Sequence, residues 1–242
     1  MQWMRKAISI SAITLAVAMT APAFAADYTA DVVVIGAGAS GSAAALASQQ
    51  SGAKTILLEK TPFQMGAGSF AGGMFAADSS QQKAAGKTVD KKWLFNQYLS
   101  LSGGFQNSLL VRRIIDESGK TVDWLNANGC RMTLVDAGTG GAYAHIGMPA
   151  TLHGYQDGGA KALVALKDSF LKAGGQALFS TRATELIKDA KGNVTGVRII
   201  GKDGKPGKVT AKAVVIASGG FGGNKDMLER YIGVPYTMGE VT

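Results

Sequence analysis

Three glycines and one acid in the N-terminal part of the chain have the types and spacing to bind a dinucleotide. They lie in the stretch DVVVIGAGASGSAAALASQQSGAKTILLEK, residues 31–60, as Gly36, Gly38, Gly41 and Glu59. A G-x-G-x-x-G turn lets the backbone leave a strand sharply, approach a pyrophosphate without a Cβ in the way and pack a helix on the strand. The helix N-terminus then offers N–H groups and a positive dipole end to the phosphates.

Glu59 fits the ribose of such a ligand. It follows Gly36 by 23 residues and is expected at the tip of a second strand, where a carboxylate accepts hydrogen bonds from a ribose diol and repels a 2′-phosphate. The acid therefore argues against NADP. The glycine pattern alone is a weak signal, but a strand before it, a helix after it and the acid favour dinucleotide binding over a structural glycine turn.

The elements around the glycines predict an α/β fold. The Val- and Ile-rich residues 31–35 are typical of a strand buried on both faces of a parallel sheet. A helix through SGSAAALASQQ, closed by Gly52, and a second buried strand, TILLE from Thr55, complete a compact strand-turn-helix-strand unit. This is the start of a Rossmann-like domain.

The rest of the chain continues as mixed α and β structure. Residues 60–80 are expected to be a glycine-rich loop, residues 90–128 mostly helical with Gly129 as the stop, and a further helix starts near Asp157. The segments ATELIKD, VTGVRII and GKVTAKAVVIA then predict a β-meander that ends in a buried strand.

The first 25 residues have the three parts of a secretory signal. Arg5 and Lys6 precede an apolar run, residues 7–20, and the small-residue exit Ala23-Phe24-Ala25 predicts cleavage after Ala25. The run is shorter than the roughly 20 residues that cross a bilayer, so no membrane span is expected after cleavage. Because a twin arginine is lacking, we expect a Sec-type route to the periplasm.

The composition limits which macromolecular partners and which redox or metal centres are expected. The chain has 25 Lys+Arg against 17 Asp+Glu, a net charge of +8, but the surplus is scattered, so no nucleic-acid partner is expected. Cys130 is the only cysteine, which rules out an internal disulfide and a cysteine-ligated haem or cluster, and we expect it to be buried. His145 and His153 are expected in glycine-rich loop without a catalytic role. No catalytic residue and no metal site is predicted.

Four ordered motifs resemble one known family. VVVIGAGASGSAAALASQQSGAKTILLEK, GAGSFAGGMFAAD, HGYQDGGAKALVALK and AKAVVIASGGFGGNKDMLERY follow the landmarks of the fumarate reductase and succinate dehydrogenase flavoproteins. The chain is most similar to the soluble periplasmic branch with flavocytochrome c fumarate reductases and urocanate reductase. The resemblance implies a Rossmann-like FAD-binding domain over residues 26–242.

The resemblance also implies which residues bind FAD. Gly36, Gly38, Ala39, Ser40 and Gly41 correspond to the phosphate turn, and Glu59 and Lys60 to the adenosine ribose. The other corresponding positions are the flavin loop (Ala67, Gly68, Gly72, Gly73), the adenine edge (Ala183) and the second glycine turn (Ala217, Ser218, Gly219, Gly220).

Two departures from the family change what is expected of the cofactor. Where the family has Asn and Thr or Ser, this chain has Ala67 and Gly68, so side-chain hydrogen bonds to FAD are missing there. Membrane-bound members attach FAD through a histidine in this loop, but residues 60–80 contain none, so non-covalent FAD is expected.

The family's reaction is hydride transfer from reduced flavin to an activated C=C bond, with a small dicarboxylate or unsaturated acid as substrate. The electron donor would be another protein, such as a cytochrome or a flavin domain. In the family, a Gly-Asp-Gly stretch, a capping domain and a C-terminal FAD-domain segment follow the second glycine turn, and this sequence stops before them. We therefore expect the N-terminal part of such an oxidoreductase. A catalytically inactive remnant and, less favoured, an NAD-dependent dehydrogenase are the alternatives.

Overall fold

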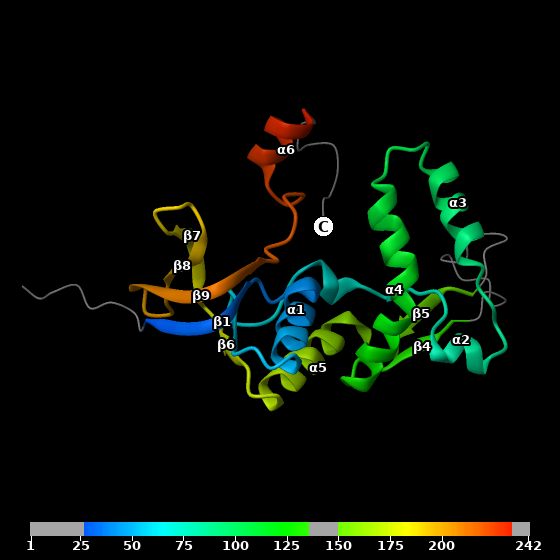
Figure 1. Ribbon diagram of the computed structural model, residues 1–242, viewed down its shortest axis with the longest axis horizontal. Coiled ribbons are helices and arrows are strands. Elements are labelled where there is room, and N and C mark those ends of the chain that lie inside the picture. Colours follow the sequence, from blue (N-terminus) through cyan, green and yellow to red (C-terminus); the bar gives the residue numbers. More distant parts are fainter. Residues whose placement is uncertain (1–26, 136–149, 234–242) are drawn as a thin grey trace, which may run out of the picture.

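A six-stranded sheet lies at the centre of the larger part of the molecule (Figure 1). The computed structural model describes residues 27–135 and 150–233. The strand order is β6-β2-β1-β9-β8-β7, in which the first four strands pair in parallel and β7 and β8 add antiparallel pairs. The strands are β1 (Tyr28–Ile35), β2 (Thr55–Leu58), β6 (Gln176–Leu178), β7 (Arg182–Lys188), β8 (Val194–Ile200) and β9 (Pro206–Ile216). The predicted parallel sheet and β-meander are thus confirmed.

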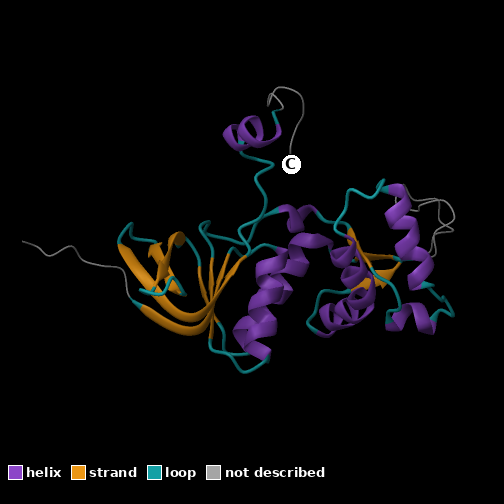
Figure 2. Ribbon diagram, turned by 45° about the horizontal axis from the view of Figure 1, so that its top comes forward, coloured by secondary structure: helices purple, strands orange, loops and turns teal. Residues whose placement is uncertain are grey.

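The two faces of this sheet are covered differently. Helices α1 (Ala39–Gln50) and α5 (Gly158–Lys172) pack together on one face (Figure 2), and their core includes Val34, Leu46 and Phe170, each 0% exposed. The other face has its own cluster, built from β1, β2 and the meander strands β8 and β9. Burial on both faces agrees with the prediction from the apolar residues 31–35.

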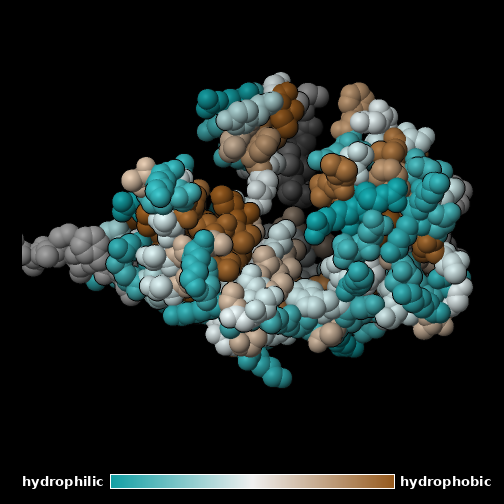
Figure 3. Space-filling model, in the orientation of Figure 1, coloured by the Kyte–Doolittle hydropathy of each residue, from teal (hydrophilic) through white to brown (hydrophobic). Residues whose placement is uncertain are grey.

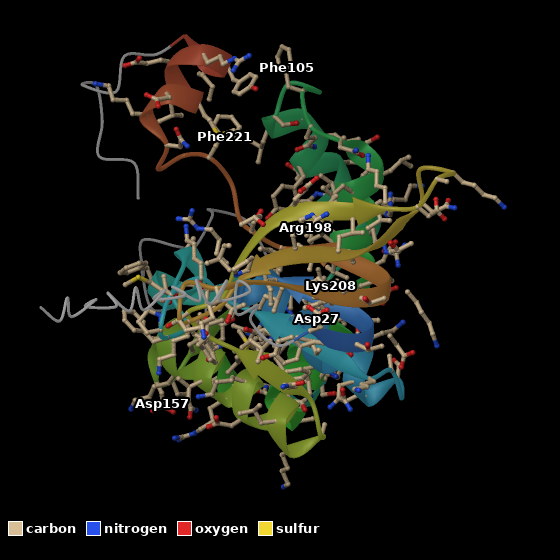
Figure 4. The ribbon with its side chains drawn as sticks, turned by 90° about the vertical axis from the view of Figure 1, so that its left-hand side faces the viewer. Asp27, Phe105, Asp157, Arg198, Lys208 and Phe221 are labelled. Carbon is tan, nitrogen blue, oxygen red and sulfur yellow. The ribbon has the colours of Figure 1, made fainter. Side chains whose placement is uncertain are left out.

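Strand β9 is less buried than its sequence predicts. It lies between β1 and β8, yet only Val209 and Ala211 of its eleven residues are buried, and Ile216 is 63% exposed. The start of β1 is tied to β9 by an ion pair that Figure 4 shows, with Lys208 Nζ 3.6 Å from Asp27 Oδ2. The apolar C-terminal residue of β9, Ile216, is thus exposed to solvent although the strand lies inside the sheet.

A second, smaller β-sheet was not predicted. The three-stranded antiparallel sheet β3-β5-β4 brings together β3 (Gly73–Phe75), β5 (Leu152–Tyr155) and β4 (Met132–Leu134). The expectation of loop over residues 60–80 was wrong at β3 and at the 3-10 turn η1 (Ala67–Phe70). Short strands without alternating hydrophobic residues give little sequence signal.

Helices α2 (Ser80–Ala84), α3 (Lys91–Leu101) and α4 (Ser108–Ala127) accompany the small sheet. Gly129, with φ of +88°, ends this helical region as predicted. α3 and α4 form a hairpin with exposed apolar residues, among them Leu101, Phe105 and Leu109. Helix α6 (Lys225–Ile232) stands apart from the sheet and also carries apolar surface (Figures 1 and 3). Among the residues described, no helix has the length and apolarity to cross a membrane.

Candidate cofactor site

Two glycines of the first turn are required by the fold itself. Gly36 follows β1 with φ of +100°, and a Cβ there would lie 2.5 Å from the Ala217 carbonyl oxygen. A Cβ on Gly41 would overlap the carbonyl oxygen of Gly36, because helix α1 lies against the end of β1 at that point. Both glycines therefore permit the close packing of strand, turn and helix.

Gly38 is different, because no protein contact explains it. Its φ of −71° suits any residue, and the protein atom nearest to an added Cβ is the Met65 carbonyl oxygen at 4.0 Å. The space in front of Gly38 is open. A glycine that neither the backbone conformation nor the packing requires fits a position where a ligand's pyrophosphate approaches the backbone.

The N-terminus of α1 opens toward the same space. Gly38 caps this 12-residue helix without a side-chain capping bond, and the first turn contains no acidic residue. The first N–H groups of a helix have no intrahelical acceptor and carry the positive end of the dipole. The turn is therefore suited to an anion such as a phosphate.

Glu59 connects the end of β2 to this turn. Its side chain is buried, and its Oε2 accepts a hydrogen bond from Ala37 N at 2.8 Å. Its Oε1 accepts hydrogen bonds from Thr61 N and Thr61 Oγ1, both at 2.9 Å. Because an ionised carboxylate accepts about four hydrogen bonds, Glu59 retains capacity for a ligand hydroxyl.

Two further side chains fix the turn from the helix side. Ser42 Oγ donates to Ala37 O at 3.1 Å, and Gln64 Nε2 donates to Ser42 Oγ at 2.9 Å. Together with the Glu59 bond, these contacts hold both the N–H and the carbonyl of Ala37. The loop after β2 is thereby held against α1 before any ligand binds.

A pocket of about 410 Å³ lies in front of the turn. The predicted positions that line it are Gly36, Gly38, Ala39, Ser40, Glu59, Lys60, Ala67, Gly68, Ala217, Ser218 and Gly219. Residues far apart in the sequence thus converge on one pocket. Thr61, Met65 and Gly66 also line the pocket and were not predicted. A hydroxyl two residues after Glu59 was the one sequence signal that could have indicated Thr61.

A smaller pocket of about 140 Å³ continues from the first and shares Gly36, Glu59, Lys60 and Ser218 with it. Ala183, predicted at the adenine edge, lines this second pocket, next to Arg182 and Thr181, which were not predicted. Glu59 therefore borders both pockets.

Four predicted positions line neither pocket. Gly41 lies behind the turn, and Gly72, Gly73 and Gly220 lie outside both linings. A Cβ on Gly73 would overlap the His153 carbonyl oxygen, so the pairing of β3 with β5 already requires glycine there. The assignment of these glycines to the cofactor remains a prediction.

His153 was wrongly placed in a loop, since it lies in β5 and is 0% exposed. Its Nδ1 is 3.2 Å from the Thr151 carbonyl, which can only accept, so Nδ1 donates and Nε2 accepts from Ser79 Oγ at 2.8 Å. Burial lowers the pKa of His153, against smaller opposing effects of the Thr151 carbonyl and Asp123. The lowered pKa favours the neutral form of this ring, which is bonded only to groups of the protein. His145 lies outside the described residues.

Cys130 is buried as predicted, and burial raises the pKa of its thiol to about 11. A thiol with this pKa stays protonated near neutral pH and is a poor nucleophile. Among the residues of the chain that the structure describes, no three His, Cys, Asp or Glu side chains gather in a way that could hold a metal ion.

Comparison with known proteins agrees with this geometry. The family model described as FAD binding domain matches residues 31–238. A fumarate reductase (cytochrome) from Shewanella frigidimarina is 34% identical over 203 residues, which are 84% of this chain and 35% of the relative. A vinyl phenol reductase from Lactiplantibacillus plantarum is 36% identical over 83% of this chain and 40% of its own length.

The open conformation of a flavocytochrome c3 fumarate reductase has a similar fold, with a TM-score of 0.74 and 28% identity over 84% of this chain and 36% of that chain. The 3-ketosteroid-delta4-(5alpha)-dehydrogenase from Rhodococcus jostii RHA1 shares the fold with a TM-score of 0.71, 24% identity and coverage of 89% of this chain and 50% of that one. The chain thus spans little more than a third of the first curated relatives that it matches.

Proposed function

This chain belongs to the FAD binding domain family, and from that membership we propose that it is the cofactor-binding part of a fumarate-reductase-like oxidoreductase. The observation that carries the proposal is the open space at Gly38. The fold requires glycine at positions 36 and 41, whereas neither the backbone conformation nor the packing requires it at Gly38, which borders the pocket. The pocket there combines a helix N-terminus, a buried acid and a second glycine turn, which suit the adenosine diphosphate half of FAD.

Each group of this chain has a separate task in the proposed complex. The first turn of α1 holds the pyrophosphate, and Glu59 accepts a hydrogen bond from the adenosine ribose. Ala37 keeps the turn in place through its bonds to Glu59 and Ser42. Ser218 and Gly219 also line this pocket. When bound, FAD would supply the hydride chemistry, which is a property of the flavin.

The proposed substrate is a small unsaturated acid. Relatives are named for the reduction of fumarate, vinyl phenol and urocanate, compounds that each contain a C=C bond conjugated to an electron-withdrawing or aromatic group. We propose reduction of such an activated bond beside a carboxylate, with electrons from an external cytochrome or flavin domain. FAD is proposed to be non-covalent, because residues 60–80 contain no histidine.

We also propose that the protein works in the periplasm after cleavage behind Ala25. The support is the basic start, apolar run and small-residue exit of residues 1–25. N-terminal sequencing of periplasmic material should give Ala26 as the first residue. An intact Met1 on the exported protein would contradict this proposal.

Titration of the purified 242-residue chain with FAD and NAD⁺ tests the proposed cofactor. We expect weak, saturable FAD binding and NAD⁺ binding no tighter than that of FAD, because the two share the adenosine diphosphate half and the pocket offers no contacts that we can assign to a nicotinamide. NAD⁺ binding tighter than FAD binding would favour a dehydrogenase instead.

The same preparation tests whether these 242 residues suffice for catalysis. We expect it to be largely colourless and poorly soluble, and to be inactive with reduced viologen and fumarate, since a flavin without covering protein loses apolar contacts and exposed apolar residues favour aggregation. Phe105 is 98% and Leu109 82% exposed. A yellow, stoichiometrically flavinylated monomer that reduces fumarate would show that these residues suffice for catalysis.

A further inference from the structure

We propose that Thr61 is a positioning residue, which holds Glu59 for the ribose and so favours ligands with an intact 2′,3′-diol. This inference rests on the proposed function. Thr61 lines the pocket directly beside Glu59. It offers two donors to one carboxylate oxygen, since its N and its Oγ1 both lie 2.9 Å from Glu59 Oε1.

The carboxylate is held at both of its oxygens. Ala37 N donates to Oε2 from the glycine turn, and Thr61 donates twice to Oε1 from the far side. Rotation of the carboxylate about its last bond would break contacts on both sides. The remaining lone pairs of Glu59 therefore keep one direction before the ligand arrives, which lowers the entropy lost on binding.

Thr61 is itself held by backbone contacts. Its carbonyl accepts a hydrogen bond from Ser180 N at 2.9 Å, and Thr181 N donates to the Glu59 carbonyl at 2.8 Å. These bonds connect the segment after β2 to the segment after β6. The Thr61 hydroxyl also lies 2.7 Å from the Phe63 carbonyl, so its hydrogen is shared between that carbonyl and Glu59.

Removal of the hydroxyl should therefore affect the ribose more than the phosphates. In a Thr61→Val variant, the backbone N–H still reaches Glu59 Oε1, but the second donor is lost. The carboxylate gains freedom, and its bond to a ribose hydroxyl weakens. The groups proposed to contact the phosphates, at the start of α1, do not involve Thr61.

Calorimetric titration with two nucleotides separates these effects. The probes are ADP, which has the ribose diol, and 2′,3′-dideoxy-ADP, which lacks it; the proteins are the wild-type chain, Thr61→Val and Thr61→Ser. We expect Thr61→Val to weaken ADP binding about three- to tenfold, the range of one net hydrogen bond, and to leave dideoxy-ADP binding unchanged. Thr61→Ser restores the hydroxyl and should bind ADP like the wild type. Thermal melting by circular dichroism verifies that each variant is folded.

The outcomes distinguish this inference from the proposed function. ADP binding by the wild type with no change in Thr61→Val contradicts the role of Thr61. An equal loss for both nucleotides contradicts it as well, because that result assigns the hydroxyl to the shape of the loop through Phe63. A Thr61→Ser variant as weak as Thr61→Val also counts against it. Failure of the wild type to bind either nucleotide contradicts the proposed function, and the inference with it.

Discussion

The glycine turn after β1 and the small sheet β3-β5-β4 are both places where the backbone comes close to other atoms, yet their glycines have different explanations. At the small sheet, the pairing of β3 with β5 accounts for Gly73. At the turn, packing accounts for Gly36 and Gly41 but leaves Gly38 facing open space. A glycine therefore points to a ligand only where contacts within the protein do not already require it.

The polar groups of the two regions differ in the same way. In the small sheet, His153 and Ser79 are fully buried and bond to each other, so no group is left for a ligand. At the turn, Glu59 is buried but lines two pockets and retains acceptor capacity. The first region is a structural support, and the second is the candidate site.

The largest expected effect is at Gly41. A Gly41→Ala substitution places a methyl group into the Gly36 carbonyl oxygen, a backbone atom that cannot move away without distorting β1. We expect the free energy of unfolding to fall by about 3 kcal/mol or more, measured by urea denaturation. Gly223→Ala is the control, because a Cβ there meets no atom within 4 Å. Equal stability of the two variants would show that the packing at Gly41 is wrongly described.

Gly38→Ala should lower the affinity for FAD with little effect on the stability of the fold. The conformation suits alanine, but alanine is a poorer N-cap than glycine, so the two effects oppose each other and stability should change by no more than about 1 kcal/mol. FAD affinity should fall about tenfold or more, since the methyl group occupies the space proposed for the pyrophosphate. Fluorescence titration measures the affinity, with Gly223→Ala as the matched control. A Gly38→Ala variant that binds FAD like the wild type removes Gly38 from the site.

Glu59→Gln tests the acid that serves both the turn and the ligand. The amide oxygen of glutamine can still accept on one side, but the amide nitrogen cannot accept on the other, so the bond from Ala37 N or the bond from Thr61 N is lost and the free chain should lose about 1–3 kcal/mol of stability. FAD affinity should fall about tenfold or more, because a charge-assisted bond to the ribose is lost. Glu185→Gln is the control, since this exposed acid pairs at the surface with Arg198, which Figure 4 labels. Unchanged FAD affinity would exclude Glu59 from the site.

The smallest effect is expected in the small sheet, as a dependence of stability on pH. Because burial lowers the pKa of His153, the unfolded chain binds a proton at a higher pH than the folded chain does. Stability from this group is complete above about pH 6.5, the ordinary pKa of an imidazole in the unfolded chain, and falls as the pH drops below it, by at most about 1.4 kcal/mol per pH unit. Urea denaturation between pH 7.5 and 5.5 measures it. In His153→Gln, this slope should be reduced. A wild-type slope that persists in full in the variant would assign it to other groups.

The large sheet and the residues gathered at the glycine turn could be predicted from the sequence because both depend on local patterns. Residues 31–35, the glycine spacing and Glu59 lie in one contiguous unit, and the meander strands are separated by clear turn residues. Ala183 and Ala217 could be added only through the resemblance, since they approach the turn by tertiary folding. For these parts, the expected positions agree with the pockets.

The small sheet and its polar network could not be predicted for physical reasons. β3, β4 and β5 have three or four residues each, too few for a periodic pattern, and they pair across large sequence separations. His153 has glycine and leucine as neighbours, which suggested a loop, yet its burial depends on Ser79, 74 residues away. Thr61 was missed because its role comes from its contact with Glu59 and not from a motif.

The central claim is that this chain binds the adenosine diphosphate end of FAD at the turn around Gly38. The most direct test is competition calorimetry of the purified chain with FAD, ADP and FMN. We predict that FAD and ADP bind with dissociation constants within about threefold of each other and compete for one site, whereas FMN does not bind, because the described pockets offer contacts to the adenosine diphosphate half. FMN binding as tight as that of FAD, or FAD binding that ADP does not displace, would contradict the claim.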